Sequence, residues 1–132
     1  MITLQRYLTS DSKYPDREQS PELVLEFRVN AGKLIEAVNN LLRDLKINDV
    51  VISSGFRTQE ANKAAGGSKF SAHCSCEAID IVDKDKKLYN NLLVSIPLLS
   101  KCGLYMEHGD HTATWVHLQT RRPKSGNRIF IP

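Results

Sequence analysis

Apolar residues recur at helical spacing through the first third of the chain. The apolar positions between Phe27 and Leu45 follow this spacing and predict one long amphipathic helix over about 21–46. Ser20-Pro21-Glu22 is a favourable start for such a helix. Serine caps the first turn, proline is tolerated inside it, and glutamate lies near the positive end of the helix dipole.

The segment that precedes this helix has no clear period. Residues 1–19 are mostly polar, and we expect them to form an irregular N-terminal segment. We expect Tyr7, Leu8 and Tyr14-Pro15 to dock the segment on the rest of the protein.

Short apolar and β-branched runs in the remaining chain predict strands. They cover Asp49–Ser54, Glu77–Val82, Leu104–Glu107, Thr114–Gln119 and Arg128–Ile131. A short helix is expected over Glu60–Ala65, and a second core-facing helix from Leu88, interrupted or restarted at Pro97 and stopped at Gly103. Helices separated from short, locally connected strands indicate an α+β fold, a small antiparallel sheet with helices packed on it.

Two loops connect these elements near the middle of the chain. Ser68–Cys76 is expected to be a loop that follows the Gly66-Gly67 helix end. Asp83–Lys87, in which every residue is charged, is expected to be a solvated turn.

Composition narrows the class of protein. At 132 residues the chain is expected to form one domain over 1–132, and its net charge of +3 is too small for a dedicated nucleic-acid binder.

No apolar run approaches the ~18 residues of a membrane span, so we expect no stable membrane insertion. The first residues lack the pattern of a signal peptide, so synthesis in the cytoplasm is expected. Three cysteines do not suggest a disulfide framework.

Three residues are candidate metal ligands. His73 and Asp80 border the predicted strand at Glu77–Val82, and His117 lies in the predicted strand at Thr114–Gln119. Two imidazoles and one carboxylate suit a catalytic zinc ion that keeps a fourth position for water. Spacing alone also permits a structural role for His117.

Glu107 is the candidate general base. It ends the apolar run Leu104-Tyr105-Met106, on a strand expected to pair with the strand of His117. A glutamate there could accept a proton from an activated water and return it to a leaving amine.

Other residues near these positions allow rival interpretations. Cys74 and Cys76 follow His73 closely enough to suggest a cysteine-containing metal site, although their spacing does not match a zinc ribbon. His108, Asp110 and His111 either form a solvated loop or assist proton transfer. Arg57 either pairs with a structural acid or binds substrate.

Several blocks occur in the order seen in a known family. They are Ser54-Gly55-Phe56-Arg57-Thr58, the segment from Asn62 to Lys69 with its two glycines, Ser71-x-His73-x6-Asp80, and Trp115-Val116-His117. Over about residues 50–120 the chain resembles the zinc peptidases of peptidoglycan, namely D-Ala-D-Ala carboxypeptidases and L-alanyl-D-glutamate endopeptidases. These enzymes share a fold with the Hedgehog signalling domain, and the resemblance is strongest to small, single-domain phage members.

The resemblance implies a role for each matching residue. His73, Asp80 and His117 would bind one zinc ion per chain, and Glu107 would be the general base. Arg57 would hold a substrate carboxylate or steady the carbonyl oxygen, while Ser71 would orient the ligand loop or contact substrate. Trp115 would wall the cleft.

The same resemblance implies a setting. The substrate would be a peptidoglycan peptide, and the protein would act as a monomer on the bacterial cell wall, in some members after phage-assisted release.

Two departures from the family pattern leave an alternative open. Cys76 stands where the family usually has glycine, and Thr114 stands three residues before the last histidine, where many members place the catalytic acid. The alternative is a catalytically inactive member that acts as a cell-wall-binding or phage structural module.

Overall fold

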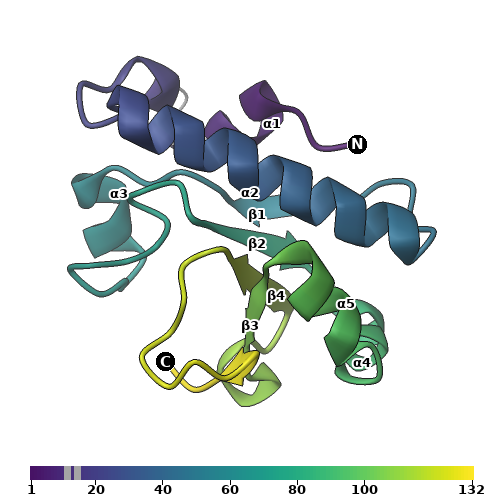
Figure 1. Ribbon diagram of the computed structural model, residues 1–132. Helices are drawn as coiled ribbons and strands as arrows, with labels where there is room; N and C mark the ends of the chain where they lie inside the picture. Colours follow the sequence, from purple (N-terminus) through teal and green to yellow (C-terminus); the bar gives the residue numbers. More distant parts are fainter. Residues whose placement is uncertain (11–12, 14–15) are drawn as a thin grey trace.

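A five-stranded sheet lies at the centre of the computed structural model, which describes residues 1–10, 13 and 16–132 (Figure 1). The strand order is β1-β2-β4-β3-β5. Neighbouring strands are antiparallel except β3 and β5, which are parallel. The strands are β1 (Ile52–Ser54), β2 (Ala78–Val82), β3 (Tyr105–Glu107), β4 (Trp115–Gln119) and β5 (Ile129–Phe130).

Helices flank this sheet and confirm the predicted α+β class. The long helix α2 runs along one side of the sheet, and α4 and α5 lie together near one of its ends (Figure 1). In the described residues, no helix has the length and apolar character needed to cross a membrane. The helices are α1 (Leu4–Leu8), α2 (Leu25–Asp44), α3 (Gln59–Ala64), α4 (Lys87–Leu93) and α5 (Ile96–Cys102), with 3-10 turns at Arg17–Gln19 and Gly109–His111.

The core forms between α2 and one face of the sheet. Side chains alternate across a strand, so β2 and β4 direct every second residue to the same face. On the core face they contribute Ile79, Ile81, Val116 and Leu118, all fully buried. The apolar stripe of α2 joins the same cluster, with Ala31, Leu34, Ile35, Val38, Leu41 and Leu42.

Helix α2 begins at Leu25, later than the predicted start near residue 21. The hydroxyl of Ser20 accepts a hydrogen bond from the backbone N–H of Glu22 at 3.2 Å, which closes a turn before the helix. Leu23 is buried in the core, and the turn directs it there. The prediction misplaced the start of the helix because Ser20-Pro21-Glu22 forms this turn and not the first turn of α2.

The N-terminal segment is more ordered than expected. Residues 4–8 form α1, and the Thr3 hydroxyl caps this helix by accepting a hydrogen bond from the backbone N–H of Arg6 at 3.1 Å. Tyr7 and Leu8 are buried, as expected, and the Tyr7 hydroxyl donates to the Ala78 carbonyl at 2.8 Å. The expectation of an irregular segment was therefore wrong for α1, because tertiary contacts stabilise so short a helix. Tyr14 and Pro15 lie outside the described residues.

The predicted second core-facing helix is divided into α4 and α5. The break falls at Val94-Ser95, and Pro97 occupies the first turn of α5. Gly103 ends α5 with a φ of +71°, as its position in the sequence predicted.

The charged stretch at 83–87 begins with a buried residue, not a solvated one. The two Asp83 carboxylate oxygens accept hydrogen bonds from the backbone N–H groups of Leu88 at 3.0 Å and Tyr89 at 2.9 Å. Asp83 thereby caps the first turn of α4, where backbone donors have no partner within the helix. The prediction of a solvated turn therefore holds for only part of the segment, which includes the exposed Asp85.

Replacing this cap should destabilise the fold. We expect Asp83→Ala to lower the free energy of unfolding by about 2 kcal/mol, because two buried backbone donors lose a charged acceptor. Asp85→Ala is the matched control, since that carboxylate is exposed and accepts one backbone hydrogen bond from Lys87. Urea unfolding of both variants measures the difference, and equal losses would contradict the capping role.

Candidate functional site

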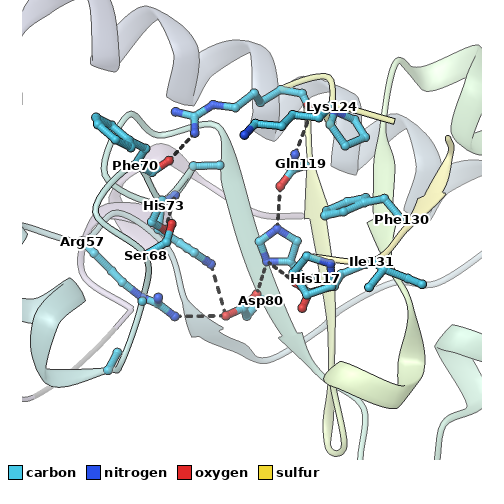
Figure 2. Close-up of a pocket in the computed structure, with 18 of the residues that line it drawn as sticks. Arg57, Ser68, Phe70, His73, Asp80, His117, Gln119, Lys124, Phe130 and Ile131 are labelled. Carbon is cyan, nitrogen blue, oxygen red and sulfur yellow. Dashed lines mark hydrogen bonds and ion pairs between the residues drawn. The ribbon is translucent and has the colours of Figure 1, made fainter. Parts of the chain in front are cut away.

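A cleft of about 670 Å³ opens on the face of β2 and β4 that points away from the α2 core (Figure 2). Residues from the chain after β1, the loop after α3, the strands β2, β3, β4 and β5, and the C-terminal segment line this cleft. Among them are the predicted site residues Arg57, Ser71, His73, Asp80, Glu107, Trp115 and His117. The fold thus brings every predicted site residue to one concave surface.

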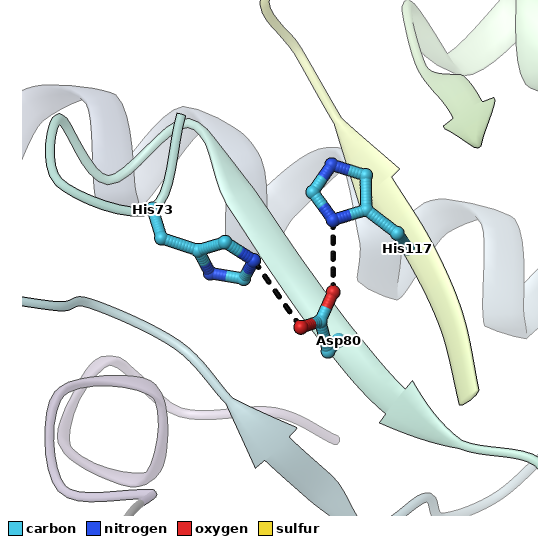
Figure 3. A group of neighbouring side chains, drawn as sticks. All are labelled: His73, Asp80 and His117. Atoms are coloured by element: carbon cyan, nitrogen blue, oxygen red, sulfur yellow. Dashed lines mark hydrogen bonds and ion pairs between the residues drawn. The ribbon is translucent and has the colours of Figure 1, made fainter. Parts of the chain in front are cut away.

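Strand register places two of the candidate ligands side by side. Asp80 on β2 lies directly opposite His117 on β4 in the antiparallel pairing. Directly opposite residues of paired strands share a face, so both side chains point into the cleft. The Asp80 Oδ1 lies 2.8 Å from His117 Nδ1 (Figure 3).

The third candidate, His73, comes from the loop between α3 and β2. Its Nδ1 lies 2.8 Å from the Gly55 carbonyl, which can only accept, so Nδ1–H donates this bond. The opposite nitrogen, Nε2, faces Asp80 Oδ2 at 3.3 Å (Figure 3). The Ser71 hydroxyl accepts a hydrogen bond from the His73 backbone N–H at 3.2 Å, so Ser71 orients this loop.

The three side chains are close enough together to bind one metal ion. One donor atom from each of His73, Asp80 and His117 lies within 4.8 Å of the others, and all three residues are buried. Two imidazole nitrogens and a carboxylate oxygen are donors that zinc accepts, and three protein donors leave a coordination position free. The residues present therefore fit a catalytic zinc ion.

Electrostatic interactions among these side chains shift their pKa values. Burial raises the pKa of Asp80, but His73 and His117 outweigh burial and hold that pKa well below its usual range. Burial lowers the pKa of His117, but hydrogen bonds to Asp80 and Gln119 outweigh it and raise the pKa above the ordinary value. For His73 burial dominates, and its pKa is lowered. The carboxylate thus stays charged, as a metal ligand must.

Glu107 lies beside this group at the end of β3. Its Oε2 is 3.9 Å from His117 Nδ1, and its side chain is mostly buried. Burial raises the pKa of Glu107, against the attraction of His117. A carboxylate with a raised pKa next to a metal-binding group is suited to proton transfer.

Arg57 pairs with the same buried carboxylate. Its Nη2 lies 3.3 Å from Asp80 Oδ2, and its Nε donates to the Ser54 hydroxyl at 2.8 Å. The structural interpretation of Arg57, pairing with an acid, is therefore satisfied. Its side chain also lines the cleft, so a substrate role stays a prediction.

The rival cysteine site receives no support among the residues that the structure describes. The metal-ligand group found there contains no cysteine. Cys74 is half-buried, Cys76 is fully buried, and neither forms a disulfide. His108, Asp110 and His111 do not line the cleft; the His108 Nδ1 instead accepts a hydrogen bond from the Asp110 backbone N–H at 3.1 Å.

Cys76 adopts the backbone conformation that favours glycine. Its φ is +61°, in the left-handed region that residues with a side chain rarely adopt. The tight turn that follows His73 requires this angle, and the Cys76 backbone N–H donates to the His73 carbonyl at 3.3 Å. The thiol is fully buried in the core cluster that also contains Tyr7, so cysteine fits without displacing the loop.

Two residues of the site were missed by sequence reasoning. Gln119 Oε1 lies 2.8 Å from His117 Nε2, and the alternation along β4 could have indicated it, because residues 117 and 119 share a face. The second is Arg121, which contacts the ligand loop. It donates to the Phe70 carbonyl at 2.5 Å and the Ser75 hydroxyl at 2.7 Å, and it pairs with Glu77 at 3.1 Å.

Comparison with known proteins gives one match. The sequence profile of a family described as Peptidase M15 matches residues 15–119, which include all seven predicted site residues. Neither the curated proteins nor the solved structures give a match to this chain.

The left-handed backbone conformation of Cys76 leads to a prediction about stability. We expect Cys76→Val to lower the free energy of unfolding by about 2 kcal/mol or more, because a β-branched residue at positive φ is strongly strained. Cys76→Gly should change it by no more than about 1 kcal/mol, since relief of strain offsets the lost buried side chain. Urea unfolding in the presence of a chelator measures both.

Cys74→Val is the matched control for this pair. Cys74 is a half-buried cysteine of the same loop, and its φ is not positive. Its replacement should change stability by less than about 1 kcal/mol. A Cys74→Val loss as large as that of Cys76→Val would contradict the conformational explanation.

Proposed function

Since the chain belongs to the peptidase M15 family of zinc peptidases, we propose that it hydrolyses an amide bond in the peptide part of bacterial peptidoglycan. The family supports the general activity, that of a zinc metallopeptidase with a peptide substrate. The proposal adds the wall peptide as substrate and names two kinds of enzyme, a carboxypeptidase or an endolysin-type endopeptidase.

The observation that carries the proposal is the position of Glu107. This carboxylate and the His73, Asp80 and His117 group line one cleft, with Glu107 3.9 Å from the nearest candidate ligand nitrogen. Thr114, at the position where many family members have the catalytic acid, is exposed and does not line the cleft. The cleft therefore favours Glu107 as the base.

The proposed ligands of one zinc ion per chain are His73 Nε2, an Asp80 oxygen and His117 Nδ1. When bound, the ion lowers the pKa of a water molecule to about 7 and polarises the substrate carbonyl. Glu107 would accept a proton from the attacking water and donate it to the leaving amine. Its raised pKa suits both transfers. The carboxylate accepts a proton from water more readily than an ordinary carboxylate does, and the protonated carboxyl group is still acidic enough to donate that proton to an amine.

Basic side chains would recruit the substrate. Arg57, Arg122 and Lys124 line the same cleft as the proposed zinc site. The carboxylates of a wall peptide would pair with these cations, and a guanidinium suits a carboxylate in particular. Trp115 and Ser71, which also line the cleft, would contact the peptide.

The alternative, an inactive wall-binding or phage structural module, has less to support it. Its motivation was the pair of departures at Cys76 and Thr114. Cys76 adopts the required turn, and Glu107 is available beside the ligands. We therefore propose the enzyme in preference to the module.

Metal content tests the ligand assignment. We expect purified protein to contain about one zinc per chain, and His73→Ala or Asp80→Ala to lose it, because two remaining donors hold zinc poorly. Elemental analysis after dialysis measures this content. His108→Ala is the control, since His108 lies outside the cleft and should leave the zinc in place. Full metal content in both ligand variants would overturn the assignment.

Activity tests the role of Glu107. Glu107→Gln should keep its zinc and lose at least about 100-fold in hydrolysis, because the amide cannot accept the proton. The measurement is the release of new amino groups from purified bacterial wall, with and without chelator. Glu60→Gln, an exposed glutamate on α3, should retain full activity.

The same assay separates the candidate functions. Chelator-sensitive release of amino groups supports the enzyme, whereas wall binding without release would support the module. A D-Ala-D-Ala peptide and an L-Ala-D-Glu peptide, assayed in parallel, distinguish the carboxypeptidase from the endopeptidase. A fully active Glu107→Gln protein would require another base.

A further inference from the structure

We propose that Gln119 is a positioning residue that fixes which nitrogen of His117 is presented to the metal ion. The inference rests on the proposed zinc-binding role of His73, Asp80 and His117. It concerns a side chain that lies behind the ligand, on the side away from Asp80 (Figure 2).

The orientation of the Gln119 amide is fixed by its second partner. Its Nε2 donates to the Arg121 carbonyl at 2.7 Å. A backbone carbonyl can only accept, so the nitrogen end of the amide must face Arg121. The oxygen end, Oε1, therefore faces His117 Nε2 at 2.8 Å.

This orientation determines the protonation of the histidine. The Gln119 oxygen offers only lone pairs, so the hydrogen bond requires a proton on His117 Nε2. His117 Nδ1 lies on the other side of the ring and faces Asp80 and Glu107, at 2.8 Å and 3.9 Å. A metal ion would take the place of the proton that Nδ1 shares with Asp80, while Gln119 retains the proton on Nε2.

Each histidine donates a ring N–H to an acceptor on the side away from the metal site, but the donating nitrogen is Nδ1 in His73 and Nε2 in His117. For His73 the outer acceptor is the Gly55 backbone carbonyl, which binds Nδ1–H and leaves Nε2 facing the cleft. For His117 the outer acceptor is a side chain and can be replaced by mutation. An outer acceptor of this kind orients a ligand imidazole and raises its basicity.

Burial makes this hydrogen bond important. His117 and Gln119 are only 8% and 7% exposed, and the Phe130 ring packs edge-on against the imidazole with centroids 6.2 Å apart. Water therefore has little access to replace the lost acceptor. Without the Gln119 oxygen the Nε2–H group would be buried and unpaired, which is costly.

Zinc affinity measured by competition with a chromophoric chelator tests the proposal. Gln119→Leu, which has similar size and no acceptor, should bind zinc about 10- to 100-fold more weakly than the unaltered protein. Gln119→Glu restores an acceptor and should recover most of the affinity. Gln59→Leu, a glutamine replacement on α3 away from the ligands, should leave the affinity unchanged.

Nuclear magnetic resonance of zinc-loaded protein, labelled with 15N in histidine, gives a second readout that needs no variant. We expect the His117 proton on Nε2 and the His73 proton on Nδ1. In Gln119→Leu, exchange of the His117 proton with water should accelerate, while the His73 proton, bound to the Gly55 carbonyl, serves as the internal reference. Equal acceleration at both histidines would indicate general loosening of the site and overturn the specific role.

Two further results would overturn the inference alone. These are a zinc-bound His117 that carries its proton on Nδ1, and a folded Gln119→Leu protein with unchanged zinc affinity. Failure of the unaltered protein to bind zinc would instead reject the proposed function, and this inference with it.

Discussion

The burial of one carboxylate, that of Asp80, joins the separate parts of this structure. Its oxygens lie within 3.3 Å of donors from His73, His117 and Arg57, which come from a loop, a strand and the segment after β1. A buried carboxylate without partners would cost several kcal/mol. The contacts of these three groups with Asp80 therefore stabilise the fold, and the same contacts assemble the candidate metal site.

The sheet provides the frame for this meeting. Helix α2 and the core-facing residues of β2 and β4 hold the two strands in one register, because a slip of one residue would move every side chain to the opposite face. In that register Asp80 lies opposite His117, and Ile79 opposite Leu118. Apolar packing on one face thus determines polar geometry on the other.

His73 depends on a different kind of support, since it comes from a loop. The Gly55 carbonyl binds its ring, the Ser71 hydroxyl binds its backbone, and Arg121 ties the surrounding loop to the segment after β4. The left-handed turn at Cys76 then brings the chain into β2. The loop is therefore held by hydrogen bonds, by backbone conformation and by the burial of Cys76 in the core cluster.

The sequence by itself determined the parts that repeat or follow a known order. The helical period predicted α2, the short apolar runs predicted the positions of the strands, and ordered motifs predicted the M15 family that the profile match supports. These features are local, because a few neighbouring residues carry each signal. The seven predicted site residues do line one cleft, and their roles stay predictions.

Only the tertiary structure decided the features that depend on partners distant in the chain. Helix α1 forms where Tyr7 reaches Ala78, and Asp83 is buried because it accepts the first backbone donors of α4. Arg121 reaches back more than forty residues to the ligand loop. None of these contacts has a period or a fixed spacing, because a single long-range hydrogen bond leaves no repeated pattern in the residues around it.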